Sequence, residues 1–123
     1  MAEMDEQTRK GLLEYQNLQQ NLQFSAMQKQ QLAIQLDEVQ KALEELEKAG
    51  EGTEIYRAVG SVFVRKDRGS LKNELLEEKE SIELRKGSLE KQEKKMAERF
   101  ESLRKELEAS MRKMEPENAP KAN

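Results

Sequence analysis

The sequence contains no histidine, no cysteine and no tryptophan. Histidine and cysteine supply most of the zinc ligands, thiol nucleophiles and general bases that proteins use. Their absence predicts that the chain is not an enzyme and holds no metal or other cofactor. Its six glycines are scattered and form no Gly-x-x-x-x-Gly-Lys loop for a nucleotide phosphate. A lack of cysteine is also typical of proteins kept in a reducing compartment.

Long hydrophobic runs are missing as well. No stretch approaches the roughly 18 apolar residues of a membrane-spanning helix, so we expect no membrane segment, and the chain opens with no secretory signal pattern. Hydrophobic residues make up 35% of the chain and charged residues 38%, which leaves little for a compact core and predicts an extended chain. The net charge of −3, with basic and acidic residues interleaved, predicts no nucleic-acid binding.

One stretch, residues 53–66, has the composition of a β-hairpin. Two runs rich in β-branched and aromatic residues, 55–59 and 62–65, flank Gly60-Ser61, and glycine in the first central position favours a type II′ turn. Folding about that turn places apolar residues on both faces: Ile55, Val59, Val62 and Val64 on one, and Tyr56, Ala58 and Phe63 on the other. Neither face suits solvent, so we expect strands of partner chains to cover them. The predicted oligomerisation hairpin comprises Ile55, Tyr56, Val59, Gly60, Val62, Phe63 and Val64.

The segments on either side of the hairpin carry apolar residues alternately three and four positions apart, which is the spacing of a coiled-coil seam. Residues 1–52 are therefore predicted to form one helix and residues 67–114 a second, with Asp67 or Ser70 as its N-cap. Residues 115–123 contain two prolines and no periodicity, so we expect them to be disordered. The expected fold is mainly α: an antiparallel two-helix coiled coil joined by a single β-hairpin that assembles into an oligomeric β-platform.

The two seams also predict how the helices face each other. A short hairpin makes them antiparallel, and matching large residues against small ones selects one register. That register opposes Gly11 to Leu107 and Ser25 to Glu93. A slip by one heptad is the alternative.

Apolar residues at the open ends of the helices and on the outward side of the first helix indicate candidate binding surfaces. Those at the open ends of the helices have no third element to bury them, and methionine adapts its shape to irregular apolar partners. These candidate residues are Met1, Met4, Leu12, Leu13, Met111 and Met114. A second candidate apolar surface, on the outward side of the first helix, comprises Phe24, Met27 and Ile34. The alternatives are that Met1 is only the initiator, that Met4 and Met114 close the coiled coil, and that the outward residues are ordinary surface or contact a neighbouring subunit.

The order of helix, single hairpin and helix resembles a β-class prefoldin subunit, and the archaeal form most of all. The resemblance is carried by Gln-Lys-Ala-Leu-Glu-Glu-Leu-Glu-Lys-Ala at 40–49, by the hairpin at 53–66, by Gln28-Lys29-Gln30, and by Leu-Glu-Lys-Gln-Glu at 89–93. An α-class subunit would need a second hairpin, which this sequence lacks.

This resemblance implies a hexamer of two α-class and four β-class chains, whose hairpins build a double β-barrel platform carrying six coiled coils. It further implies an ATP-independent, cytoplasmic chaperone that holds non-native proteins at the coiled-coil ends and delivers them to a group II chaperonin. The client-contacting ends correspond to the start of the first helix and the close of the second.

A competing interpretation is a structural scaffold, in which an antiparallel coiled coil joins folded partners and has no affinity for unfolded chains. Such a spacer would normally end in a tight polar loop and would need no β-platform. The hairpin with two apolar faces and the methionine-bearing helix ends favour the chaperone over this scaffold.

Overall fold

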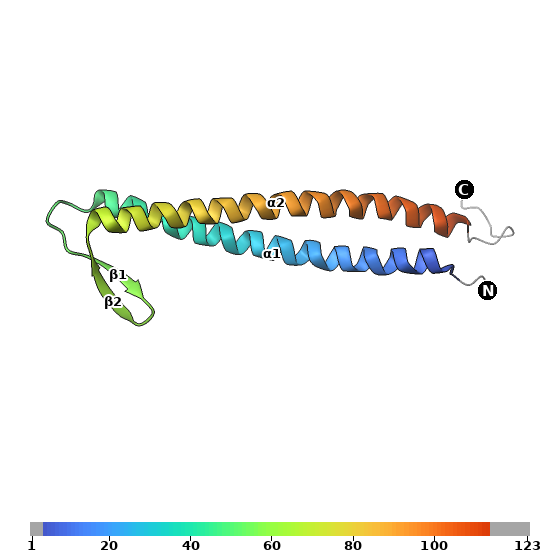
Figure 1. Cartoon of the computed structure of the whole chain (residues 1–123), viewed down its shortest axis with the longest axis horizontal. Helices are drawn as coiled ribbons and strands as arrows, with labels where there is room; N and C mark the ends of the chain where they lie inside the picture. The colour runs from blue at the N-terminus through green and yellow to red at the C-terminus, as the bar shows by residue number, and fades with distance from the viewer. Residues whose placement is uncertain (1–3, 114–123) are drawn as a thin grey trace, which may run out of the picture. The chain divides into compact units, whose positions relative to one another are not determined.

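The computed structural model describes residues 4–113, in which two long helices are joined by a two-stranded antiparallel hairpin (Figure 1). Helix α1 spans Glu6–Lys48, strand β1 Ile55–Val59, strand β2 Val62–Lys66 and helix α2 Arg68–Lys113. The predicted mainly α fold, with two antiparallel helices joined by a single β-hairpin, is therefore confirmed.

An aspartate side chain caps the N-terminus of each helix. The Thr8 backbone N–H donates to Asp5 Oδ1 at 2.6 Å, and the Ser70 N–H donates to Asp67 Oδ2 at 3.1 Å. Each bond satisfies one of the backbone donors that a helix start leaves without a helical acceptor. Of the two caps considered for the second helix, Asp67 is the one used.

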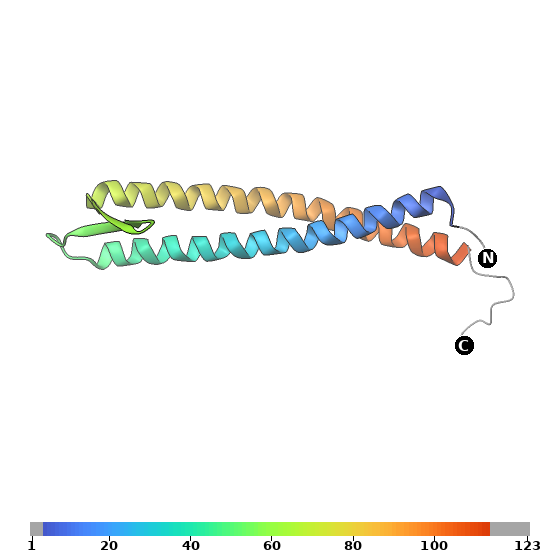
Figure 2. The same cartoon turned by 90° about the horizontal axis from the view of Figure 1, so that it is seen from below.

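The chain divides into two compact units along the helices. The terminal unit consists of the described residues 4–27 and 90–113, and the hairpin unit of residues 28–89. Each unit contains a segment of α1 and a segment of α2. Both views show these segments side by side and running in opposite directions (Figures 1 and 2).

The register of the terminal unit follows from three contacts. A Cβ atom added to Gly11 would lie 3.1 Å from Leu107 Cδ2, and Ser25 Oγ donates to Glu93 Oε2 at 3.2 Å. Between these layers the rings of Tyr15 and Phe100 stack with their centroids 4.4 Å apart. The predicted register is confirmed in this unit, and the one-heptad slip is not adopted.

The core of the hairpin unit is a cluster of Leu46, Leu71 and Leu75, against which Val39, Ala42, Leu43 and Ile55 pack. The heptad pattern did not place Leu71 in the seam, because it is adjacent to the seam position held by Lys72. Leu71 is nevertheless buried in this cluster, against which Ile55 of the hairpin also packs.

The hairpin has the predicted strands and turn, with β2 one residue longer than expected. The outermost cross-strand pairs are Ile55 with Lys66 and Val59 with Val62. Gly60 has a φ of +60°, whereas Ser61 is not in the positive-φ region. This pair of conformations fits a type II′ turn and not a type I′ turn, which needs positive φ at both central residues.

Arg68 joins the end of α1 to the start of α2. Its Nη2 donates to the carbonyl oxygen of Leu46 at 2.9 Å and also to that of Ala49. The last carbonyl groups of a helix have no intrahelical donor. The guanidinium therefore caps α1 from the first residue of α2.

Candidate functional site

The outward face of the hairpin is formed by every second residue of each strand. Tyr56, Ala58 and Phe63 are all exposed, and the Phe63 side chain is 77% exposed. The Tyr56 hydroxyl donates to Glu54 Oε2 at 2.9 Å, so the polar end of this ring is already bonded. Apart from Arg65, which pairs with Tyr56 across the strands on this face, what remains is an apolar surface that this chain does not cover.

The opposite face of the hairpin carries Ile55, Val59, Val62 and Val64, as predicted, but it is not apolar along its whole length. Arg57 lies between Ile55 and Val59 on this face, and Lys66 pairs with Ile55 across the strands. Both cations turn toward α2. Toward the turn, Val59, Val62 and Val64 are exposed. The expectation of two wholly apolar faces was therefore wrong for the half that adjoins the helices.

Arg57 and Lys66 form ion pairs with Glu74 and Glu78 of α2. Arg57 Nη1 lies 3.0 Å from Glu74 Oε2 and Arg57 Nη2 lies 2.5 Å from Glu78 Oε1. Lys66 Nζ lies 3.0 Å from Glu74 Oε1. Hydrogen bonds from Lys66 and then Arg57 lower the pKa of Glu74 below its usual value. Hydrogen bonding to Glu78 is the main cause that raises the pKa of Arg57.

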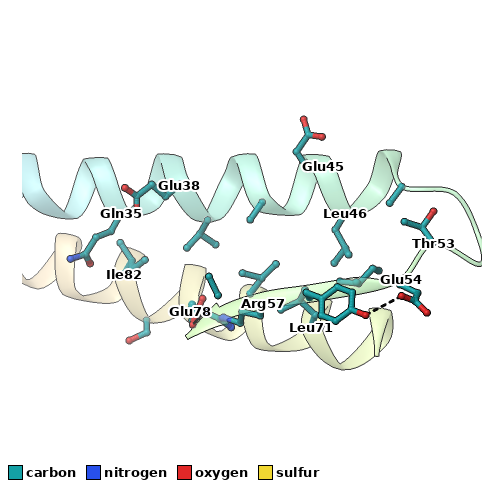
Figure 3. A pocket seen from close by; sticks show the side chains of 18 of the residues that line it. Gln35, Glu38, Glu45, Leu46, Thr53, Glu54, Arg57, Leu71, Glu78 and Ile82 are labelled. Atoms are coloured by element: carbon teal, nitrogen blue, oxygen red, sulfur yellow. Dashed lines mark hydrogen bonds and ion pairs between the residues drawn. The ribbon is translucent and has the colours of Figure 1, made fainter. Parts of the chain in front are cut away.

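An open groove of about 820 Å³ lies between the hairpin and the two helices of the hairpin unit (Figure 3). Leu46, Leu71 and Ile82 contribute apolar surface, and Glu38 and Glu78 contribute carboxylates. The groove therefore offers apolar contact beside negative charge.

The structure describes four of the six candidate residues at the helix ends. Leu13 is 56% exposed and Met111 is 46% exposed, whereas Met4 and Leu12 are half-buried. All four belong to the terminal unit. Met1 and Met114 lie outside the described residues. Among the four described residues of this candidate surface, Leu13 and Met111 are thus the most accessible.

The second candidate surface is exposed along α1. Phe24 and Met27, both in the terminal unit, and Ile34, in the hairpin unit, each expose about half of the side chain or more. They lie outside the seam, so α2 does not cover them. This exposure fits both interpretations given above, a binding surface and a contact with a neighbouring subunit.

Two exposed apolar residues of α2 were not among the candidates. Leu84 is 68% exposed and Leu76 is also exposed. Both were recognisable as apolar residues outside the seam, although no cluster of similar residues marked them. Neither lies in the terminal unit, which makes them useful controls for experiments on the helix ends.

Residues 4–113 contain neither a cluster of metal ligands nor a membrane-spanning helix. In that range no three acidic side chains come together as ligands for a metal ion. Neither described helix combines the length and apolarity needed to cross a membrane.

Glu14 and Arg99 form a two-pronged ion pair across the helices of the terminal unit. Arg99 Nε donates to Glu14 Oε1, and Arg99 Nη2 donates to Glu14 Oε2, both at 2.8 Å. Planar pairing of this kind is a strong form of charge-assisted hydrogen bond. The guanidinium accordingly holds the pKa of Glu14 below its ordinary value of 4.5.

We expect this pair to weaken in acid. Because the pKa of Glu14 is lower in the folded than in the unfolded chain, its contribution to stability is complete above about pH 4.5 and is lost as the pH falls through the lowered value. A carboxyl NMR titration should place the midpoint of Glu14 below 4.5, and Arg99→Gln should raise it. Glu101, whose pKa is lowered mainly by Arg104, serves as the control and should not change. An unaltered Glu14 midpoint in Arg99→Gln would contradict the pairing.

The fold and its exposed hairpin define a class of protein, a coiled-coil subunit built for assembly, and comparison with known proteins agrees with this. The sequence model of the family described as prefoldin subunit matches residues 9–114. The chain is 38% identical over 112 residues to prefoldin subunit beta of Thermococcus onnurineus, covering 91% of this chain and 97% of the relative. It is 36% identical over 108 residues to prefoldin subunit beta of Archaeoglobus fulgidus, covering 88% and 93%.

A solved structure gives the same answer. The crystal structure of the prefoldin beta subunit from Thermococcus strain KS-1 superposes with a TM-score of 0.79 at 32% sequence identity, covering 91% of this chain and 98% of that one. The chain belongs to the prefoldin subunit family, and its predicted resemblance to the archaeal β class is confirmed. Prefoldins are non-enzymatic chaperones, and membership implies that this chain assembles with other prefoldin subunits.

Proposed function

We propose that this chain is the β-class subunit of an ATP-independent holdase that captures non-native proteins and prevents their aggregation. The observation that carries the proposal is the uncovered apolar hairpin, on which Phe63 is 77% exposed. Large exposed apolar groups on a two-stranded hairpin favour association, because an isolated hairpin is marginally stable in water. A spacer for folded partners has no need of such a surface.

In the proposed assembly, four copies of this chain and two α-class subunits join their hairpins into a double β-barrel platform. Ile55, Tyr56, Val59, Gly60, Val62, Phe63 and Val64 form the oligomerisation hairpin. Closing strands into barrels removes exposed sheet edges and buries apolar side chains. The hairpin would thereby gain the neighbours that a single chain does not provide.

Client capture is assigned to the helix ends. Leu13 and Met111 are exposed there, and Met4 and Leu12 are half-buried; Met1 and Met114 complete the proposed surface. Each contact would be weak, but several ends acting on one unfolded chain would raise the effective concentration and give useful retention. Phe24, Met27 and Ile34 are proposed as a secondary contact surface.

Release is proposed to occur without nucleotide hydrolysis. A client leaves when it folds or when a group II chaperonin, which binds it more tightly, takes it over. A cytoplasmic location fits this exchange.

The proposal is tested by light scattering of a chemically unfolded protein diluted without ATP into this chain mixed with an α-class prefoldin subunit. We expect a complex of about six chains that suppresses aggregation, because several helix ends would share each client. The mass of the complex is measured in parallel. A stable complex with no suppression would contradict the holdase and favour a scaffold for folded partners.

A further inference from the structure

We propose that four side chains form an ion-pair clamp that fixes the orientation of the hairpin relative to α2. They are Arg57 and Lys66 of the hairpin and Glu74 and Glu78 of α2. The clamp would thereby determine how the apolar face is presented to partner strands. This effect on partner strands rests on the proposed assembly through the hairpin, whereas the clamp itself is a property of the single chain. The four side chains act as positioning residues.

The geometry links both strands to one helix. Arg57 lies in β1 and Lys66 in β2, yet both contact Glu74, each through a different carboxylate oxygen. Glu78 is one helical turn further along α2 and binds the second guanidinium nitrogen of Arg57. Two attachment points on different strands resist rotation about the strand axis, which a single attachment point cannot do.

Apolar packing alone does not supply this restraint. Ile55 is the hairpin residue that packs against the core cluster of Leu46, Leu71 and Leu75, and apolar contact has no preferred direction. The rest of the same face, toward the turn, is exposed. The forked guanidinium, in contrast, binds carboxylates with defined directions.

Partial burial makes the clamp more effective than an ordinary surface pair. The side chains of Arg57 and Lys66 are about 30% and 29% exposed, and those of Glu74 and Glu78 are 39% and 40% exposed. Arg65, on the opposite face, makes a longer and more exposed pair: its Nη2 lies 3.9 Å from Glu54 Oε1, and its side chain is 70% exposed. Exposed pairs are strongly screened and contribute little, whereas shielded pairs are screened less. Arg65 therefore provides a matched control with the same charge in the same strand pair.

The chain contains no cysteine, so spin labels can be attached at two introduced cysteines. Ser61→Cys places one label in the turn and Gln31→Cys places the other on the exposed side of α1 within the hairpin unit. Double electron–electron resonance then reports the distance between the hairpin and the helix. We expect one narrow distance distribution in the labelled parent. Arg57→Met should broaden it several-fold, Glu78→Gln should broaden it less, and Arg65→Met should leave it unchanged.

Charge exchange separates the clamp from a general loss of structure. Arg57→Glu should broaden the distribution further because it repels Glu74 and Glu78, and combining it with Glu78→Arg should restore much of the narrow distribution. Circular dichroism verifies that each variant keeps its helices. A distribution as narrow in Arg57→Met as in the parent would overturn the clamp.

Titration with an α-class prefoldin subunit tests the consequence for assembly. Loss of a charge-assisted pair predicts affinity about tenfold weaker for Arg57→Met. Unchanged affinity despite a broadened distribution would overturn the link to assembly. If the parent chain itself fails to bind the α-class subunit, the proposed function fails, while the spin-label distances still decide the clamp.

Discussion

Phe63→Asp is expected to give a folded, helical chain that no longer forms the complete complex with an α-class subunit. Phe63 is 77% exposed in the single chain and does not belong to the core cluster, so its replacement should leave the intrachain core intact. In the assembly, each chain would lose roughly 2 kcal/mol of apolar burial, and the introduced carboxylate would have to be desolvated in the interface. We expect helical monomers or small oligomers, measured by light scattering coupled to gel filtration, and Val62→Asp should behave alike.

Ser61→Asp is the matched control for this experiment. It adds the same charge to the same hairpin, but at a polar, exposed turn residue next to Gly60. Circular dichroism should show unchanged helix content in both variants. A complex of full mass formed by Phe63→Asp would refute assembly through the hairpin.

Serine substitution at the helix ends is expected to abolish suppression of aggregation while leaving the complex intact. The combined variant replaces Met4, Leu12, Leu13, Met111 and Met114. Capture is proposed to depend on many weak apolar contacts acting together. Removing several of them should therefore weaken the binding of an unfolded client by the product of the individual losses. The measurement is light scattering of an unfolded test protein at fixed chaperone concentration, with complex mass followed in the same samples.

The control for the helix-end variant is Leu76→Ser with Leu84→Ser. These leucines are exposed on α2 but lie outside the terminal unit, so the control removes exposed apolar surface of the same chemistry elsewhere. Suppression should persist in the control. Full suppression by the helix-end variant would exclude the helix ends as the capture surface and direct attention to Phe24, Met27 and Ile34.

Much of the fold was predictable because its determinants are local in sequence. Apolar spacing defined both helices, and the glycine at position 60 defined the turn. The register was predictable as well, because Gly11 leaves room for the large side chain of Leu107. Such features depend on residue size and spacing, which the sequence states directly.

Features that depend on where the hairpin lies were not predictable in the same way. Leu71 is buried in a cluster against which Ile55 of the hairpin also packs, and the heptad spacing did not reveal this burial. Arg57 was not assigned to either face from the sequence, and nothing in the sequence paired it with Glu74 and Glu78 rather than with solvent. For the helix ends, the sequence identified apolar residues, whereas the structure was needed to distinguish exposed Leu13 from half-buried Leu12.

The close approach at Gly11 has an evolutionary consequence. A Cβ atom there would come within 3.1 Å of Leu107, which is tighter than ordinary van der Waals contact, so even alanine would require Leu107 to move. Mutation at either position is therefore constrained by the residue at the other. A larger side chain at position 11 is accommodated when Leu107 shifts by a few tenths of an ångström or is replaced by a smaller residue.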